Sequence, residues 1–360
     1  MTGLDVLYAI GSEMALIHLH AISRNVKFEA LKYGADSRVR AVAAELGLTS
    51  DQLADRLVPD FGLDDQNTLT LDYGPRRFVV SFDEQLKPLV MDEDGRRRKE
   101  LPKPGANDDE ALATAAYQRF AGLKKDLRSV ATDQIRRLEE AMVIRRRWTG
   151  AEFRRLLVGH PLMQHLVRRL VWVTVSADGA AGTAFRVTDD GSMADVDDKA
   201  FAVGDDDVVG VAHPLDLEAD LSAWMALLTD YEILQPFPQL HRPVWRPTAE
   251  QAAQQGLPEF VDVDVPVDRL LKLERRGWWR RSVPMDAGIQ TTMECDLPGP
   301  GGMYFPLDPG ITVSDVYDQP AQFFRDARLT GADNFAALDP VIVSELLCDL
   351  HYLVNGGLLR

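Results

Sequence analysis

The chain has 360 residues, of which 46% are hydrophobic and 27% are charged, and its formal net charge is −16. This composition indicates a soluble globular protein. The length is more than one hydrophobic core usually serves, so we expect two lobes. The acidic excess argues against nucleic acid as a partner, because the protein repels a phosphate backbone.

The cysteines and the apolar stretches indicate the cellular compartment of the protein. Cys295 and Cys348 are far apart and form no C-x-x-C pair, which argues against a disulfide framework or a cysteine-rich zinc site and fits a reducing compartment. The start of the chain has no basic region, and Asp5 and Glu13 interrupt its apolar stretch, so we expect no signal peptide. No uncharged apolar run reaches the roughly 18 residues of a membrane span. We therefore expect a cytoplasmic protein with no membrane partner.

Helices are expected over residues 1–58. Apolar residues recur at helical spacing from Val6 to Ile17 and from Val39 to Leu46, and Gly47 marks a stop. Thr49 or Ser50 can cap a further helix. Short helical hairpins of this kind are also typical of the end of a helical solenoid, although no clear repeat period is present.

A small antiparallel meander is expected next, over about residues 67–102. The segment alternates apolar and polar residues and is rich in β-branched side chains. Turns at Gly74–Pro75 and Asp94–Gly95 divide it into four strands. A short loop rich in proline and acidic residues ends it.

A long helix is predicted over residues 107–147, because apolar residues recur at steps of three and four from Leu112 to Met142. Asn107 can cap the first turn, and Arg145 begins a run of three arginines at the negative end of the helix dipole. Such a helix would be about 60 Å long. Its apolar stripe must lie against something, either as an internal spine for both lobes or as half of a dimer interface.

Residues 149–360 mix strand-like and helix-like patterns. Thr149 and Glu152 form a capping box, and Asp339 caps a last amphipathic helix. The predicted fold class is therefore α+β. Residues 1–148 hold the helical segment, the meander and the long helix, and residues 149–360 form a mixed second lobe.

The stretch DYEILQPFPQLHRPVW, from Asp230 to Trp245, combines charged, amide and aromatic side chains with three prolines. We predict a strand at Tyr231–Leu234 and then polyproline-like backbone that holds its side chains in fixed directions. We call residues 231–245 the strap. It is either an internal tie between sheet and helix or a recognition surface.

The stretch LERRGWWRRSV, from Leu273 to Val283, interleaves four arginines with Trp278 and Trp279. Arginine beside indole suits bases, phosphate or an acidic partner, but it also suits a hairpin whose tryptophans enter the core. The predicted binding side chains in the strap and in this stretch are Tyr231, Gln235, Gln239, Arg242, Arg275 and Trp278.

Candidates for acid–base chemistry are few. His213 and Glu232 are the candidate catalytic residues. However, His160 and His213 each precede a proline, which favours a histidine in extended conformation at the start of a helix. Asp262 and Asp264 would lie on one face of a strand, as a metal or acid–base pair or as the solvated face of an edge strand. We predict no metal and no cofactor.

No phosphate-binding glycine loop, nucleophile elbow or zinc-protease motif is present. The ordered set HPLMQHLVRRLVW, FRVTDDGSMADVDD, VGVAHPLDL, DYEILQPFPQLHRPVW and LERRGWWRR resembles a domain of unknown function. That domain is found at the C-terminal end of bacterial proteins similar to the molybdate metabolism regulator, several of which also carry a WGR domain. The resemblance extends to the upstream segments and implies a short member, or part of a longer architecture with helical repeats. This chain has no WGR tripeptide.

Two hypotheses of function follow. The first is a non-catalytic interaction or regulatory module that binds a protein partner or a second copy of itself. The second is an enzyme of unrecognised type that acts on a nucleotide-like or other anionic small molecule, held by arginines in a cleft of the second lobe with His213 or Glu232 as base. Nucleic-acid binding through Arg275–Arg281 is a third, disfavoured by the net charge.

Overall fold

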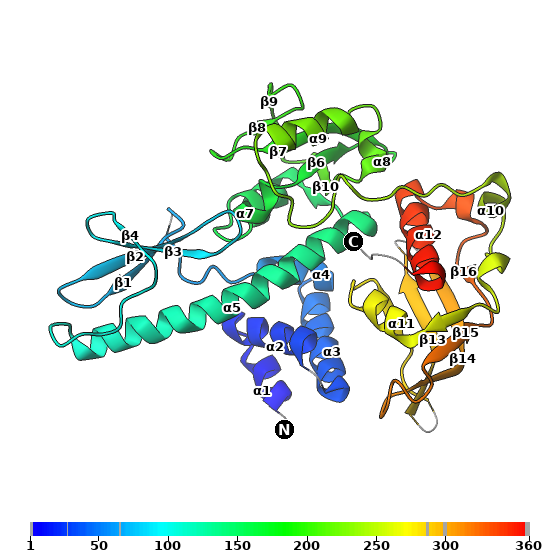
Figure 1. Ribbon diagram of the computed structural model, residues 1–360, viewed down its shortest axis with the longest axis horizontal. Coiled ribbons are helices and arrows are strands. Elements are labelled where there is room, and N and C mark those ends of the chain that lie inside the picture. Colours follow the sequence, from blue (N-terminus) through cyan, green and yellow to red (C-terminus); the bar gives the residue numbers. More distant parts are fainter. Residues whose placement is uncertain (1–2, 27, 65, 286–287, 298–300, 357–360) are drawn as a thin grey trace. The chain divides into compact units, whose positions relative to one another are not determined.

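The computed structural model describes residues 3–26, 28–64, 66–285, 288–297 and 301–356. They form the predicted α+β fold (Figure 1). One compact unit comprises Met1–Ala131 with Arg154–His165, and the other comprises Thr132–Phe153 with Leu166–Arg360. This division falls inside the long helix, whose last turns pair with groups of the second unit.

Four helices open the first unit: α1 (Gly3–Ile10), α2 (Glu13–Asn25), α3 (Glu29–Glu45) and α4 (Ser50–Arg56). Gly11, with φ of 59°, separates α1 from α2, so the predicted apolar row from residue 6 to residue 17 is broken. Thr49 caps α4 through a reciprocal capping box with Gln52, as the sequence indicated. The helices share a core that includes Leu19, Ala35 and Leu53.

The predicted meander follows as four antiparallel strands in the order β1-β2-β3-β4. Their bounds are β1 (Leu69–Asp72), β2 (Arg77–Phe82), β3 (Pro88–Asp92) and β4 (Arg97–Arg98). One face buries Leu71, Phe78, Val80 and Val90. In Figure 1 this sheet lies beside the first half of the long helix.

The long helix α5 spans Glu110–Val143 and is shorter at both ends than the predicted 107–147. Asp109, and not Asn107, caps it, since its carboxylate accepts a hydrogen bond from the Leu112 amide at 2.9 Å. At the other end Arg145 adopts φ of 59°, a left-handed conformation that stops the helix. Most of the predicted apolar stripe is buried, at Ala116, Phe120, Leu123, Leu127, Leu138 and Met142. Leu112, its first member, is exposed, and Val130 is half-buried.

The second unit contains an antiparallel sheet in the order β5-β10-β6-β7-β8-β9. These strands are β5 (Trp148–Thr149), β6 (Val171–Val175), β7 (Ala181–Val187), β8 (Met193–Ala194), β9 (Ala200–Phe201) and β10 (Val208–Val211). Between β5 and β6 the chain forms α6 (Gly150–Glu152), a π-helix at Phe153–Val158 and α7 (Gln164–Val167), and residues 154–165 of this connection belong to the first unit. Thr149 and Glu152 form the predicted capping box. Trp224, on α9 (Leu221–Asp230), packs with Val171 and Val173 on one face.

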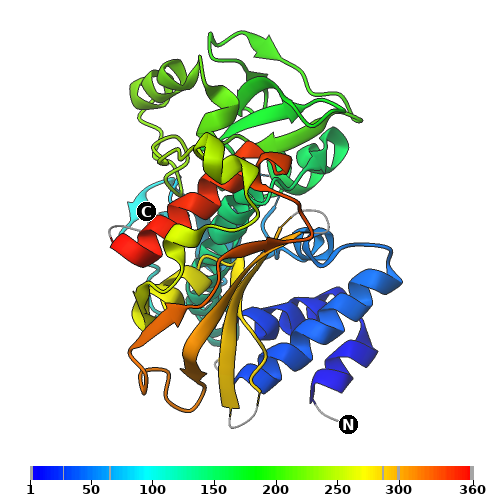
Figure 2. The same cartoon turned by 90° about the vertical axis from the view of Figure 1, so that its right-hand side faces the viewer.

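A second sheet of this unit has the order β11-β15-β14-β13-β12, with β16 also pairing with β14. The strands are β11 (Asp264–Pro266), β12 (Trp279–Arg281), β13 (Ile289–Asp296), β14 (Gly302–Thr312), β15 (Ala321–Phe324) and β16 (Arg328–Thr330). Three helices accompany it: α10 (Ala249–Ala253), α11 (Val267–Glu274) and α12 (Pro340–Asn355). Figure 2 shows α12, in red, running alongside the yellow and orange strands. Asp339 caps α12, as predicted.

Two local predictions are wrong. Residues 231–234 are not a strand, because Tyr231 ends α9 and Glu232 turns the chain with φ of 55°. Asp262 lies outside β11 with φ of 56°, so it does not share a strand face with Asp264.

Candidate functional site

The strap has an inner face and an outer face. Gln239 and Arg242 point inward and are buried, together with Phe237 and Leu240. Tyr231, Leu234 and Trp245 are exposed. Both interpretations of the strap therefore have a structural counterpart, an internal tie and an accessible surface.

Gln239 ties the strap to the first sheet of the second unit. Its side-chain NH₂ donates to the carbonyls of Val171 at 2.7 Å and Ala212 at 2.8 Å, and its carbonyl accepts from the Val171 amide at 3.0 Å. Gln235 donates to the same carbonyl oxygen at 2.6 Å. The buried amide thus pairs with the Val171 amide and the Ala212 carbonyl, as buried backbone groups require. The Val171 carbonyl also accepts from the Ala212 amide at 3.1 Å.

His213 has a capping role. It precedes α8 (Pro214–Leu217) in extended conformation, and its Nδ1 accepts from the Leu215 amide at 3.2 Å. Because Nδ1 is the acceptor, the ring proton sits on Nε2, which donates to Glu345 Oε1 at 3.2 Å. His160 caps its own turn in the same way, through the amides of Leu162 and Met163. The predicted entry of histidine and proline into a helix is confirmed at His213. His160 and Pro161 instead form a turn, and α7 begins at Gln164.

Glu345, on α12, brings the strap and His213 together. Its Oε1 also accepts from Arg242 Nε at 2.7 Å, and Arg242 Nη1 donates to Glu139 of α5 at 2.9 Å. The side chain of Glu345 is 1% exposed and that of His213 is 0% exposed. Three elements far apart in sequence therefore meet at one buried carboxylate.

The charge of Glu345 is stabilised by its partners. Burial alone would raise its pKa, but the charge of Arg242 and hydrogen bonds from His213 and Arg242 outweigh burial and lower the pKa to about 2. The same carboxylate raises the pKa of Arg242, against the effect of burial. Both groups are ionised at neutral pH.

A second buried carboxylate, Asp349, lies one turn further along α12. Its Oδ2 accepts from the indole nitrogens of Trp278 at 2.9 Å and Trp279 at 2.7 Å. Arg276 pairs with Asp349 and with Glu345, at 3.3 Å in the second case, and stacks over the Trp278 ring. Both tryptophans of the arginine-rich stretch thus enter the core, as one of the two interpretations of that stretch predicted.

A third group of charges fixes the end of α5. Arg145 donates two hydrogen bonds to Asp216 of α8, at 2.7 and 2.9 Å, and one to Asp339 at the start of α12, at 2.9 Å. This arginine joins three helix ends in the second unit. The charged and polar groups that meet at Glu345 and Asp349 form a separate set, which we call the α12 charge cluster: Glu139, His213, Arg242, Arg276, Glu345 and Asp349.

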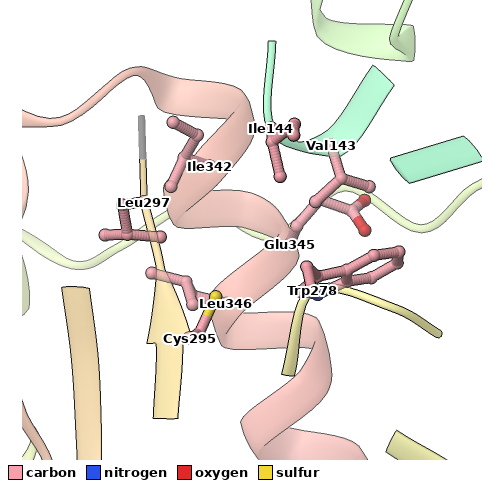
Figure 3. Close-up of a pocket in the computed structure, with 8 residues that line it drawn as sticks. All are labelled: Val143, Ile144, Trp278, Cys295, Leu297, Ile342, Glu345 and Leu346. Atoms are coloured by element: carbon pink, nitrogen blue, oxygen red, sulfur yellow. The ribbon is translucent and has the colours of Figure 1, made fainter. Parts of the chain in front are cut away.

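The space beside the α12 charge cluster is small. A cavity of about 10 Å³ lies between Ile144, Ile342 and Leu346, with the carboxylate of Glu345 at one side (Figure 3). A volume of this size holds at most one water molecule. It cannot admit a nucleotide or any comparable substrate.

The remaining candidate side chains are on the surface. The Tyr231 hydroxyl donates to Asp198 at 2.7 Å, and Arg186 stacks over the Tyr231 ring. Glu232 and Arg275 are exposed. Among the described residues, Arg275 is the one arginine of its stretch without a carboxylate partner, because Arg280 pairs with Asp296 and Arg281 with Glu274. The stretch therefore presents little net positive charge.

Comparison with known proteins places the chain in a family. The sequence profile of a family described as a domain of unknown function (DUF4132) matches residues 95–278. The chain belongs to this family. A relative from Escherichia coli, the uncharacterized protein YehI, is 34% identical over 354 residues, which are 96% of this chain and 28% of that protein. The chain therefore spans little more than a quarter of the length of this relative. No solved structure matches.

The family match covers the strap and Trp278 but ends before α12, which supplies Glu345 and Asp349. The link to the molybdate metabolism regulator and to WGR proteins stays a prediction. Among the described helices none is both long and apolar enough to cross a membrane. Within the described ranges no three histidine, cysteine or carboxylate side chains are grouped to hold a metal ion.

Sequence reasoning missed the two carboxylates of α12. Glu345 and Asp349 stand four positions apart in an otherwise apolar helix, and this spacing places them on one helix face. A pair of acids inside an apolar helix was the available signal that they are buried and paired.

Proposed function

We propose that this chain is a non-catalytic interaction or regulatory module that binds a protein partner. The observation that carries the proposal is the burial and the pairing of two polar candidates, His213 and Arg242. His213 and Arg242 are buried and bound to Glu345, and the adjacent cavity is about 10 Å³. A catalytic base must reach the proton that it abstracts, and this geometry offers a substrate no route to His213.

The thiols give no alternative nucleophile. Burial raises the pKa of the Cys348 thiol to about 11 and raises that of Cys295 as well. The thiolate is the reactive form of cysteine, and neither side chain forms it at neutral pH. Glu232, the other candidate base, is exposed at a left-handed turn, and within the described part of the chain no side chain holds its carboxylate.

The surface supports binding. Large apolar side chains that are exposed gather on α1 to α3 and on the outer face of the strap. Exposed apolar patches on a protein surface often mark sites of interaction with another molecule. Arg276, Arg280 and Arg281 are paired with carboxylates, and the net charge is −16. Both observations favour the apolar surface of a protein over nucleic acid as the partner.

Native mass spectrometry of the protein, purified gently from its own cells, tests the proposal. We expect a complex with a second polypeptide, and no small molecule in stoichiometric amount. A co-purified small anion that is lost in Arg275→Ala would overturn the proposal in favour of an enzyme or a ligand sensor. Arg275 suits this control because it is exposed and its loss leaves the α12 charge cluster intact.

A further inference from the structure

Arg147 lies between the end of α5 and the start of β5, and its guanidinium rests on the first sheet of the second unit. Gly210 of β10 makes room for it, because a Cβ atom at that position would stand 2.3 Å from Arg147 Nη1 and 2.8 Å from Cζ. A side chain at position 210 would displace the guanidinium. Arg147 is half-buried there, so the fold holds a charged group at a defined place on the sheet.

The guanidinium of Arg147 has no carboxylate partner among the described residues. Its Nη1 donates to the backbone carbonyl of Arg146 at 3.1 Å. Other half-buried or buried arginines of the second unit do bind carboxylates: Arg136, Arg145, Arg186, Arg242, Arg276 and Arg281. A guanidinium carries more N–H donors than one bond uses, so Arg147 keeps donors for a further acceptor.

The two carboxylates whose charges act on Arg147, those of Asp216 and Asp339, are already bound. Asp216 accepts two hydrogen bonds from Arg145 and one from a backbone amide, the last at 2.8 Å. Asp339 accepts one from Arg145 and one from a backbone amide, also at 2.8 Å. Each oxygen of both carboxylates therefore has a donor, and Arg145 is the arginine that they neutralise.

The electrostatics of Arg147 agree with this geometry. Burial, and then the charge of Arg145, lower the pKa of Arg147 to about 10 against the attraction of Asp216 and Asp339. Arg147 stays charged at neutral pH, but the folded protein stabilises that charge less well than water does. An anion beside the guanidinium would restore the missing stabilisation.

The face of the sheet beside Arg147 is open at its edge. Thr149 of β5 pairs with Val208 of β10, and residues 208 and 210 lie on one face because side chains alternate along a strand. Val208 is 36% exposed, and Thr149 is exposed as well. A protein that covers Val208 would therefore also come close to the guanidinium of Arg147 and reduce its contact with water.

We infer that Arg147 binds a carboxylate side chain of the protein partner. This inference rests on the proposed function and names one residue of the interface and the chemistry that it recognises. The N–H groups of a guanidinium match the two oxygens of a carboxylate, and an arginine that loses contact with water in an interface often contributes much of the binding energy. Because Asp216 and Asp339 are bound to Arg145, the partner supplies the acid.

Nuclear magnetic resonance of the full chain, with ¹⁵N in its arginines, tests the site directly. Sodium acetate is the probe, and sodium chloride keeps the ionic strength constant. The Nε signal of Arg147, identified by its absence from Arg147→Met, should saturate at a roughly tenfold lower acetate concentration than that of Arg97, an exposed arginine of β4. Equal responses of the two signals would overturn the inference.

The variants Arg147→Met and Arg97→Met then test the complex with the partner. Methionine keeps an unbranched side chain over Gly210 and removes the charge. In native mass spectrometry of the gently purified protein, Arg147→Met should retain roughly tenfold less of the second polypeptide than the parent does. Arg97→Met should retain as much as the parent.

Urea denaturation of the same variants separates binding from folding. Arg147→Met should unfold at the same urea concentration as the parent or at a higher one, because no carboxylate of the chain loses its partner. A lower midpoint together with a weaker complex would assign Arg147 to the fold and overturn the inference.

The remaining outcomes separate this inference from the proposed function. A complex that Arg147→Met leaves unchanged would refute Arg147 as the contact and leave the interaction module standing. A co-purified small anion that is lost in Arg147→Met, with no second polypeptide, would refute both.

Discussion

The helices α12 and α1 depart from the usual pattern of a surface helix in opposite directions. α12 places Ser344, Glu345 and Asp349 in the interior, where each polar group has a partner within the second unit. α1 places Val6 and Ile10 on the exterior, where the described residues of the first unit leave them uncovered. Charge inside a protein is tolerated when it is paired, and apolar surface outside it indicates a partner.

This comparison separates two kinds of evidence for function. His213, a candidate catalytic residue, is held in the interior by Glu345, whereas Glu232 is exposed. Val6 and Ile10, which helical spacing placed in one apolar row, are exposed. The proposed interaction function belongs to the apolar side of this comparison, and the following predictions test each side.

The largest expected effect comes from Glu345→Ala. It leaves Arg242 and the ring proton of His213 buried without their acceptor, and breaking a buried ion pair from one side costs about 3–5 kcal/mol. Urea denaturation at pH 7 measures the free energy of unfolding. Glu218→Ala is the control, since Glu218 forms an exposed pair with Arg246 at 2.9 Å and should change stability by less than about 1 kcal/mol. Equal effects of the two substitutions would show that α12 is not held by its charges.

The second prediction concerns the free energy of unfolding at acid pH. The pKa of Glu345 falls from the ordinary 4.5 to about 2 on folding, so the folded state holds the carboxylate ionised more firmly than the unfolded chain. Its stabilising contribution is fully present above about pH 5 and is lost as the pH falls toward 2. Between pH 7 and pH 2.5 this group alone should remove about 2–3 kcal/mol of unfolding free energy.

Glu345→Gln isolates that contribution, because glutamine keeps the size of the side chain and does not titrate. Burial, the main cause that raises the pKa of Asp349, is present in both proteins, whereas the smaller contribution from the charge of Glu345 is absent from the variant. The variant should start from lower stability at pH 7 and lose about 2–3 kcal/mol less on acidification. Identical pH profiles for the two proteins would contradict the assignment of the acid sensitivity to Glu345.

A smaller effect is expected from Gln239→Ala, which tests the strap as an internal tie. The substitution removes the partner that Gln239 gives to the Val171 amide and to the Ala212 carbonyl, while the Val171 carbonyl keeps the Ala212 amide at 3.1 Å; buried unpaired groups of this kind cost about 2 kcal/mol together. Unfolding monitored by tryptophan fluorescence measures it, with Gln118→Ala on the exposed side of α5 as control. If the two substitutions are equally mild, the hydrogen bonds of Gln239 do not hold the strap.

The sequence predicted those parts of the fold that depend on local signals. Capping boxes, the two turns of the meander, the apolar stripe of α5 and the entry of His213 and Pro214 into a helix all depend on residues within a few positions of each other. The missed strands β8 and β9 have two residues each, too short for a periodic pattern. The wrong strand at residues 231–234 has apolar and aromatic residues, but the left-handed turn at Glu232 overrides that preference.

The candidate site was harder to predict because its decisive contacts are distant in sequence. Arg242 and His213 were recognised as chemically capable, but their acceptor Glu345 lies 103 and 132 positions away. No local pattern shows whether a polar side chain meets such a partner or meets solvent. The same limit applies to α1, where helical spacing indicates an apolar face but not whether that face is covered.

The smallest expected effect completes the comparison. Val6→Glu with Ile10→Glu should change the unfolding free energy of the isolated chain by less than about 0.5 kcal/mol, because substitutions at exposed positions outside special contacts are usually that mild. Differential scanning calorimetry measures it, and the double variant should also bind less of a dye that reports exposed apolar surface. A loss of several kcal/mol would mean that the face is already covered within the folded chain. A negligible loss, beside the large effect at Glu345, would mean that selection for these side chains acts on association and not on folding.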